Sequence, residues 1–180
     1  MPEVMLKRFS KSIESKFKVM KLFLKFVDRL SNLGAYLSSF LYLALVSLIL
    51  TEIFLRAIFN KSTMIADEYS GYFYLASVFF GLGYTFKENA HIRINIITSK
   101  LSKKANRFTD IFAGSVTLGV VIFILYRITL LTMDSYSFEI LSEGVSETPI
   151  YLTQIPMIVG IFIFALAVFG FVLKRMGDDS

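Results

Sequence analysis

The 180-residue chain has no cysteine, no tryptophan, one histidine and three prolines. Without cysteine it can form no disulfide, iron–sulfur cluster or thiolate metal site. A membrane b-type haem needs two axial ligands, usually both histidine, so the single His91 argues against a haem-carrying respiratory anchor. Charges interrupt any short apolar run in residues 1–16 and no small-residue cleavage site follows, so we expect no cleavable signal peptide.

Long apolar runs dominate what is present: 55% of the residues are hydrophobic and the mean hydropathy is +0.64. About 20 mostly apolar residues cross the hydrocarbon layer as a helix. Helix is required there because lipid cannot satisfy open backbone hydrogen-bonding groups. We therefore predict an all-α integral membrane protein, with a membrane domain over 33–175. Its four transmembrane helices are expected at about 33–59, 69–86, 108–133 and 150–173.

The positions of the basic residues predict the topology. Eight Lys or Arg residues precede residue 33 and six lie in 87–107, whereas 60–68 has one and 134–154 has none. Four spans with both termini and a tail at 176–180 in the cytoplasm satisfy the positive-inside rule. The net charge of +5 forms no stripe on a soluble face, so nucleic acid is not the expected partner.

Two polar segments adjoin the predicted spans. Residues 1–32 are basic and amphipathic, which predicts a helix on the anionic cytoplasmic leaflet, with protein docking as the alternative. Residues 87–107 are too polar to span, and their isoleucines alternate with polar residues. An isolated strand would have no partner, so an interfacial helix or an extended hairpin is expected between the second and third spans.

Several ionisable residues fall within the spans, where they are costly and usually pair or face a bundle. Glu52 and Arg56 are four residues apart and share a helical face, so they can pair with each other. Alternatively, Arg56 meets a carboxylate of another helix, such as Asp67 or Glu68. Arg127 can extend to the outer interface or pair inside the bundle.

Small residues and prolines indicate how the spans pack. Ser77, Gly81 and Gly83 predict close helix approach in the second span. Ser115 and Gly119 predict the same in the third span. Two prolines lie near the start of the fourth span, and only one of them can lie in the first turn of a helix. Either Pro156 lies inside the helix and kinks it, or 149–154 form a separate interfacial turn.

No catalytic constellation converges in this sequence, so an enzyme is not expected. Four spans without a convincing repeat also argue against a secondary transporter acting alone. The remaining reading is a membrane subunit that packs against a larger protein.

The stretch 52–101 resembles the small membrane subunit of TRAP transporters, the DctQ-type permease. The family pattern has Arg and often Asn at the end of its first span, matched by Arg56 and Asn60, then an acidic pair, matched by Asp67 and Glu68. It also has a His-Ile/Val-Arg-Val-Asp segment, matched at 91–95, and a proline-containing entry to the fourth span. Asn95 departs from the usual Asp, and Gly71 stands where Arg is frequent.

This resemblance implies a multi-pass scaffold subunit in a bacterial or archaeal cytoplasmic membrane, surrounded by lipid. Its implied partners are the large DctM-type permease subunit, which resembles an elevator transporter, and an extracytoplasmic substrate-binding protein. TRAP systems use an ion gradient, usually sodium, to take up organic acids. No cofactor is expected in this chain, while sodium ions are expected in the large subunit. The alternative is a self-sufficient homo-oligomeric transporter or channel.

On this reading the polar residues serve assembly. We expect Arg56, Asn60, Asp67 and Glu68 to form one cluster on the outer side, bracing the first two spans or meeting the partner. On the cytoplasmic side, His91 and Arg93, with Asn95 beside them, are expected to anchor the chain. Simple solvated positive charges are the alternative there. Glu52 and Arg127 are the polar residues expected within the bundle.

Overall fold

The computed structural model describes residues 2–89 and 102–177, with the side chains of 18–88, 102 and 104–177. Four helices make up nearly all of it: α1 (Pro2–Phe59), α2 (Ala66–Asn89), α4 (Lys103–Ser137) and α5 (Ile150–Gly177). The β-structure of the described chain is one isolated bridge between Leu141 and Pro149. The predicted all-α class is confirmed for these residues.

Three of the helices are long and apolar enough to cross a membrane, over Lys18–Phe59, Lys104–Ser137 and Ile150–Gly177. The helix α2 has 24 residues, which gives about 36 Å at ~1.5 Å per residue and exceeds a hydrocarbon layer of ~30 Å. It contains no stretch as apolar as those of the other three helices, because tyrosines, serines and glycines interrupt its apolar residues. The structure therefore supports a membrane protein with three membrane-capable helices and a fourth that is long enough.

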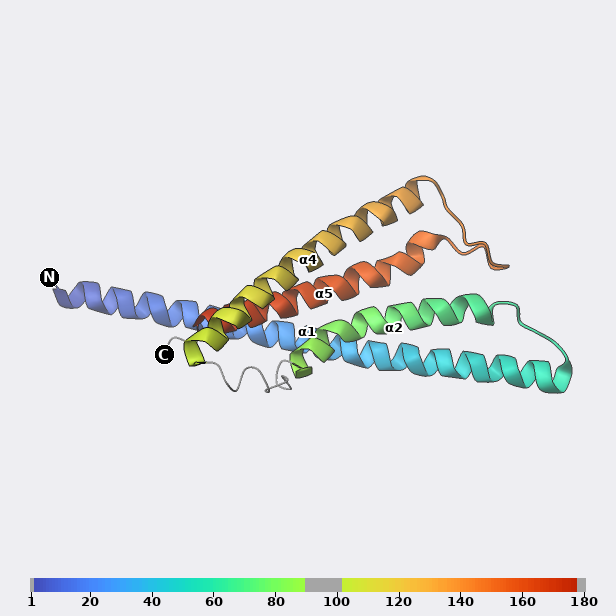
Figure 1. The fold of residues 1–180 in the computed structure, drawn as a ribbon, viewed down its shortest axis with the longest axis horizontal. Coiled ribbons are helices and arrows are strands. Elements are labelled where there is room, and N and C mark those ends of the chain that lie inside the picture. The colour runs from blue at the N-terminus through green and yellow to red at the C-terminus, as the bar shows by residue number, and fades with distance from the viewer. Residues whose placement is uncertain (1, 90–101, 178–180) are drawn as a thin grey trace.

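The first helix runs for 58 residues without a break. The predicted change from a basic segment at 1–32 to a span at 33–59 is one of composition, because the backbone stays helical across it. No proline lies at that point, and the helix continues through Gly34. Figure 1 shows the N-terminal part of α1 extending beyond the other helices.

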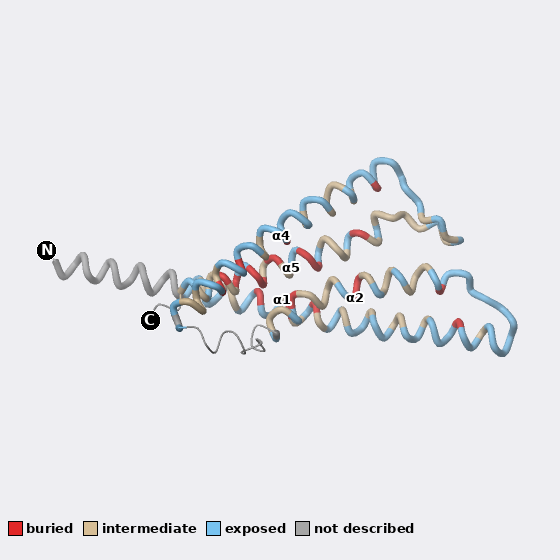
Figure 2. Tube along the Cα trace, viewed as in Figure 1, coloured by how far each residue is buried: buried red, intermediate tan, exposed pale blue. Residues whose placement is uncertain are grey.

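The helices form two antiparallel hairpins, α1–α2 and α4–α5, which lie side by side (Figure 1). The helix α5 packs on both α2 and α4 and touches α1 less. It carries the densest set of buried residues, as Figure 2 shows along its length. The core cluster joins Val121 of α4 to Ile161 and Ala165 of α5, with Phe79 of α2 packed against it.

Small residues let α2 approach its neighbours, as predicted. A Cβ at Gly81 would meet Ser38 Oγ at 3.2 Å, and one at Gly83 would meet Ile163 Cγ2 at 3.0 Å. The Ser38 hydroxyl also donates to the Ser77 carbonyl at 2.7 Å. Close approach at small residues is how helices associate where no hydrophobic effect drives them together.

Two further glycines, which were not predicted, also allow close approach between helices. A Cβ at Gly160 would lie 2.5 Å from the backbone C and O of Phe79, and one at Gly34 would lie 2.7 Å from the Phe80 carbonyl oxygen. These glycines let α5 and α1 approach the backbone of α2 at two neighbouring residues. Gly160 sets the spacing between the two hairpins, and Gly34 sets the spacing within the first hairpin.

The predicted close-packing face of α4 does not pack on any described residue of this chain. Nothing lies within 4 Å of a Cβ at Gly119, and Ser115 is exposed. Gly114 packs instead, since a Cβ there would lie 2.7 Å from Val172 of α5. Both faces of α4 are apolar, so the small residues did not reveal which face packs on the other helices of this chain.

The helix α5 begins directly after Pro149 and contains Pro156. The separate turn at 149–154 is therefore wrong, and the alternative that places Pro156 inside the helix holds. Because proline has no N–H, the Leu152 carbonyl lacks its usual intrahelical donor.

Candidate functional site

Glu52 lies near the end of α1 and is 5% exposed. Its carboxylate accepts hydrogen bonds from Arg56 Nε at 2.6 Å, Ser62 Oγ at 2.5 Å, and both Thr63 N at 3.0 Å and Thr63 Oγ1 at 2.5 Å. A buried carboxylate is tolerated only when it is paired and hydrogen-bonded. These contacts fold the loop after α1 back onto the helix.

Arg56 meets both of its predicted kinds of partner, but unequally. The pair with Glu52 is direct, whereas Arg56 Nη2 lies 3.8 Å from Asp67 Oδ2 and the Asp67 side chain is 90% exposed. Solvent screening leaves little attraction in an exposed pair at that distance. The local pair is therefore the main one, and Asp67 adds a weak second contact across to α2.

Asn60 ends α1 rather than joining the polar contacts. Its backbone φ is 50°, in the left-handed region that Asn tolerates better than most residues. The Lys61 N–H that follows donates to the Leu55 carbonyl at 3.4 Å. This conformation turns the chain out of the helix and toward Ser62 and Thr63.

Glu68 makes its contacts with a different set of residues. We call this cluster the Glu68 clasp, and it consists of Glu68, Tyr72, Ser142, Gly144 and Ser146. The Glu68 carboxylate accepts from Tyr72 OH at 2.7 Å, from Ser146 Oγ at 2.6 Å and from Ser142 Oγ. The two serines belong to the loop between α4 and α5. The clasp thus ties the start of α2 to the other hairpin.

The loop of the clasp is shaped to reach this carboxylate. The Ser142 N–H donates to the Thr148 carbonyl at 2.9 Å and the Ile150 N–H to the Ile140 carbonyl at 3.0 Å. These bonds make the loop a narrow hairpin. At its tip, a Cβ on Gly144 would collide with the Glu68 carboxylate. Glycine is needed here for close approach.

The clasp favours the ionised form of Glu68, which lies in the first turn of α2 just before the apolar stretch 69–86. Hydrogen bonds from Ser142, Ser146 and Tyr72 lower the pKa of Glu68 from 4.5 to about 2. Donors that bind the charged form of an acid lower its pKa in this way. The N-terminus of a helix also suits a negative charge.

Three of the four residues expected in one cluster thus divide into two groups, and Asn60 joins neither. Arg56 and Asp67 lie with Glu52, while Glu68 binds the distant loop. The serines and the threonine that complete both carboxylate shells were not predicted from the sequence. A glycine between serines in 142–146 was the available signal, but nothing in it indicated Glu68 as the partner.

Four predicted residues are not members of these groups. His91, Arg93 and Asn95 fall outside the described residues. Arg127 is exposed on α4 and forms no ion pair with any described residue. Pairing inside this chain's bundle, one of its two predicted fates, is therefore not seen in the described chain.

At the opposite end of the bundle, ion pairs that were not predicted join the two helices of each hairpin. Lys87 Nζ lies 3.4 Å from Asp28 Oδ1, linking α2 to α1. Arg175 Nε lies 3.1 Å from Asp110 Oδ2, linking α5 to α4. Arg107 adds donation to the carbonyls of Arg175 and Met176 at 2.9 and 2.7 Å.

Within the described part of the chain, no group of three or more His, Cys, Asp or Glu side chains is arranged to hold a metal ion. The polar groups found here bind one another and the backbone. Their geometry supports a structural role.

Comparison with known proteins identifies the chain. Residues 45–177 match the family of tripartite ATP-independent periplasmic (TRAP) transporters, DctQ component. A protein of Haemophilus influenzae named as a TRAP transporter small permease is 25% identical over 144 residues, which cover 80% of this chain and 87% of that protein. No solved structure gives a significant match. With its apolar helices and its polar groups at the helix ends, the chain belongs to the DctQ family and is a small subunit of a TRAP transporter, not an enzyme.

Proposed function

We propose that this subunit crosses the cytoplasmic membrane four times, with α2 as its second span and both termini in the cytoplasm. The end of α2, the start of α4 and the end of α5 are basic and gather at one end of the bundle, toward the start of α1 (Figure 1). The acidic loop 138–149 lies at the other end. This charge distribution supports the orientation through the positive-inside rule.

The orientation has a direct test, because the natural chain has no cysteine. Glu143→Cys and Ser180→Cys each introduce one thiol, in segments that the proposed topology places on opposite sides of the membrane. In intact cells, a membrane-impermeant maleimide should label Glu143→Cys and not Ser180→Cys. The reverse pattern, or equal labelling of both without lysis, contradicts the proposed topology.

The proposed role is that of a scaffold that packs against the large permease subunit and braces it. The supporting observation is the apolar face that α4 leaves uncovered, since α4 packs mainly on α5. Phe112, Val116, Val120 and Phe123 follow one another along this face and are each more than half exposed. Arg127 continues the same row. A charge at membrane depth usually faces a partner or pairs with another charge.

In this division of labour the large subunit holds the substrate and the sodium ions, and works as an elevator. An extracytoplasmic binding protein delivers the organic acid. The small subunit supplies static surface. The proposed transport is therefore driven by an ion gradient but requires all three components.

Arg127 tests the packing part of the proposal. We expect Arg127→Gln to lower both the yield of large subunit that co-purifies with the tagged chain and the rate of uptake. Arg127→Lys is the matched control, because it keeps the charge and should retain most of both. If Arg127→Gln binds and transports like the natural chain, Arg127 extends to lipid headgroups and this interface is wrong.

Reconstitution tests the division of labour. Vesicles containing this chain alone, under a sodium gradient and with labelled C4-dicarboxylate or sialic acid, should show no uptake. Adding the large subunit and the binding protein should produce sodium-dependent uptake of the organic acid that the binding protein recognises. Uptake by the chain alone would favour a self-sufficient homo-oligomeric transporter instead.

A further inference from the structure

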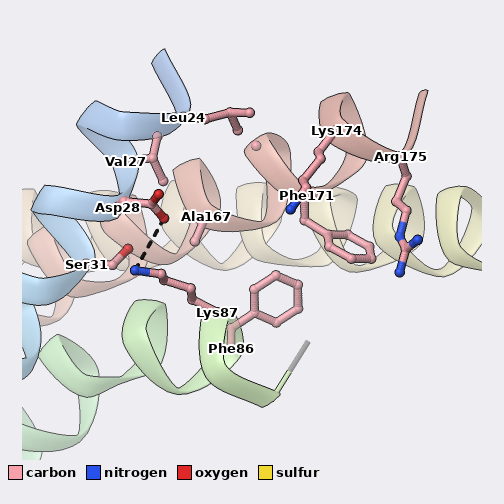
Figure 3. A pocket seen from close by; sticks show the side chains of 11 residues that line it. Leu24, Val27, Asp28, Ser31, Phe86, Lys87, Ala167, Phe171, Lys174 and Arg175 are labelled. Atoms are coloured by element: carbon pink, nitrogen blue, oxygen red, sulfur yellow. Dashed lines mark ion pairs between the residues drawn. The ribbon is translucent and has the colours of Figure 1, made fainter. Parts of the chain in front are cut away.

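A pocket of about 460 Å³ lies between α1, α2 and α5 at their basic ends. Figure 3 shows its polar lining, to which α1 contributes Asp28 and Ser31, α2 contributes Lys87, and α5 contributes Lys174 and Arg175. None of these residues takes part in the Glu52 or Glu68 contacts. The scaffold role leaves this pocket unexplained.

The pocket lining is positively charged. It has three cationic side chains and one carboxylate, Asp28. Lys87 pairs with Asp28, and Arg175 pairs with Asp110 outside the lining. Lys174 is exposed and forms no ion pair with any residue that the structure describes. After these pairings Lys174 remains as an uncompensated charge, so the pocket suits an anion.

A buried hydroxyl without a partner points to the same kind of ligand. Ser31 is 1% exposed, and its Oγ makes no hydrogen bond to any described residue. A buried donor that has no acceptor destabilises the fold. Ser31 lines the pocket on the same side as Lys87 (Figure 3). An acceptor oxygen of a bound ligand would satisfy it.

The other walls of the pocket are apolar. Phe86 and Phe171 meet edge to face at 5.7 Å, and Leu24, Val27 and Ala167 complete the lining. Lys87 and Lys174 directly end the apolar stretches of α2 and α5. In the proposed four-span topology, these positions place the pocket at the depth where a membrane changes from hydrocarbon to headgroup. Charge above an apolar wall fits an amphipathic anion better than a small soluble one.

We infer that this pocket binds the phosphate of an anionic phospholipid headgroup, with the start of an acyl chain against the aromatic wall. Basic pockets between membrane helices on the cytoplasmic side bind such headgroups. Lys174 and Lys87 contact the phosphate, and the Ser31 hydroxyl donates to one of its oxygens. The bound lipid fills the space between the hairpins at their basic end.

The test measures lipid retained by the chain after purification and exchange into detergent with added phosphatidylglycerol or phosphatidylcholine. Native mass spectrometry counts the bound lipid. We expect phosphatidylglycerol to be retained preferentially. Lys174→Gln should lower its affinity about 5-fold, since a Lys near an anionic lipid contributes ~1 kcal/mol. Ser31→Ala should also weaken binding.

Lys104→Gln is the matched control, because Lys104 is an exposed lysine at the start of α4 that does not line the pocket. It should leave retention unchanged. Equal losses in Lys104→Gln and Lys174→Gln, or no loss in either, would overturn the site. Equal retention of both lipids would overturn the anionic preference. If inorganic phosphate at the same concentration displaces the lipid completely, the pocket takes a soluble anion instead.

Discussion

The two ends of the bundle hold the same two hairpins together by different means. At the basic end the hairpins converge and pack through aromatic and aliphatic side chains, such as Phe86 against Phe164 and Phe171, while the ion pairs stay within each hairpin. At the loop end the hairpins diverge (Figure 1). There Glu68 reaches across to the opposite loop.

This difference separates permanent packing from a contact that depends on charge. Apolar burial is insensitive to pH and does not require one particular ionised group. The Glu68 clasp holds fully only while a single carboxylate is ionised. We expect the loop end to open under conditions that leave the basic end intact, and four predictions examine this contrast in order of expected effect.

The largest effect is expected where the hairpins touch. Gly160→Ala places a Cβ 2.5 Å from the Phe79 backbone, which cannot move aside as a side chain could. Overpacking of this kind costs ~1–3 kcal/mol, so the thermal transition of the purified protein should fall. Gly119→Ala is the control with open space around it, and should be neutral or raise stability by up to ~1 kcal/mol. Equal effects of the two would refute the close contact.

A smaller loss is expected at the basic end from Asp110→Asn. The Asp110 side chain is 7% exposed and Arg175 is 37% exposed, so removing the charge leaves a partly buried guanidinium unpaired. Partial screening reduces the usual cost of a broken buried pair to ~1–2 kcal/mol. Asp134→Asn, an exposed position on the same helix, should change thermal stability little. A loss at Asp134 as large as that at Asp110 would contradict the role of the pair.

Gly144→Ala should open the loop end locally. The added Cβ collides with the Glu68 carboxylate and displaces the loop. Hydrogen exchange in 138–149 should accelerate, while the basic end keeps its protection. Gly71→Ala, on α2 with nothing within 4 Å of the new Cβ, should leave exchange in the loop unchanged. Slow exchange in Gly144→Ala would mean that the clasp does not hold the loop.

The smallest effect is a pH dependence that distinguishes the two ends. Because folding lowers the pKa of Glu68 to about 2, its stabilising contribution is fully present above the ordinary value of 4.5. That contribution is lost progressively as pH falls from 4.5 toward 2. Relative to Glu68→Gln, the natural chain should protect the loop better at pH 6, and the difference should shrink below pH 4.5. A difference that stays constant with pH would exclude ionised Glu68 as the cause.

The sequence allowed the helices to be predicted well because apolar runs and flanking charges are local signals. It predicted Gly81 and Gly83 correctly, since α2 is small-residue-rich on the packed side. It could not separate Gly119 from Gly114, because lipid-facing and protein-facing surfaces of α4 are equally apolar. Nor could it connect Glu68 with Ser146, since 78 residues separate them and only the fold brings them together.

The central claim is that this small TRAP subunit acts as a scaffold bound to a large permease subunit. The most direct measurement is native mass spectrometry of the tagged chain, purified in mild detergent from the membranes of its own organism. The account predicts a complex of this chain with a larger multi-span protein, from which the chain dissociates intact. A homo-oligomer of this chain without any larger protein would contradict it.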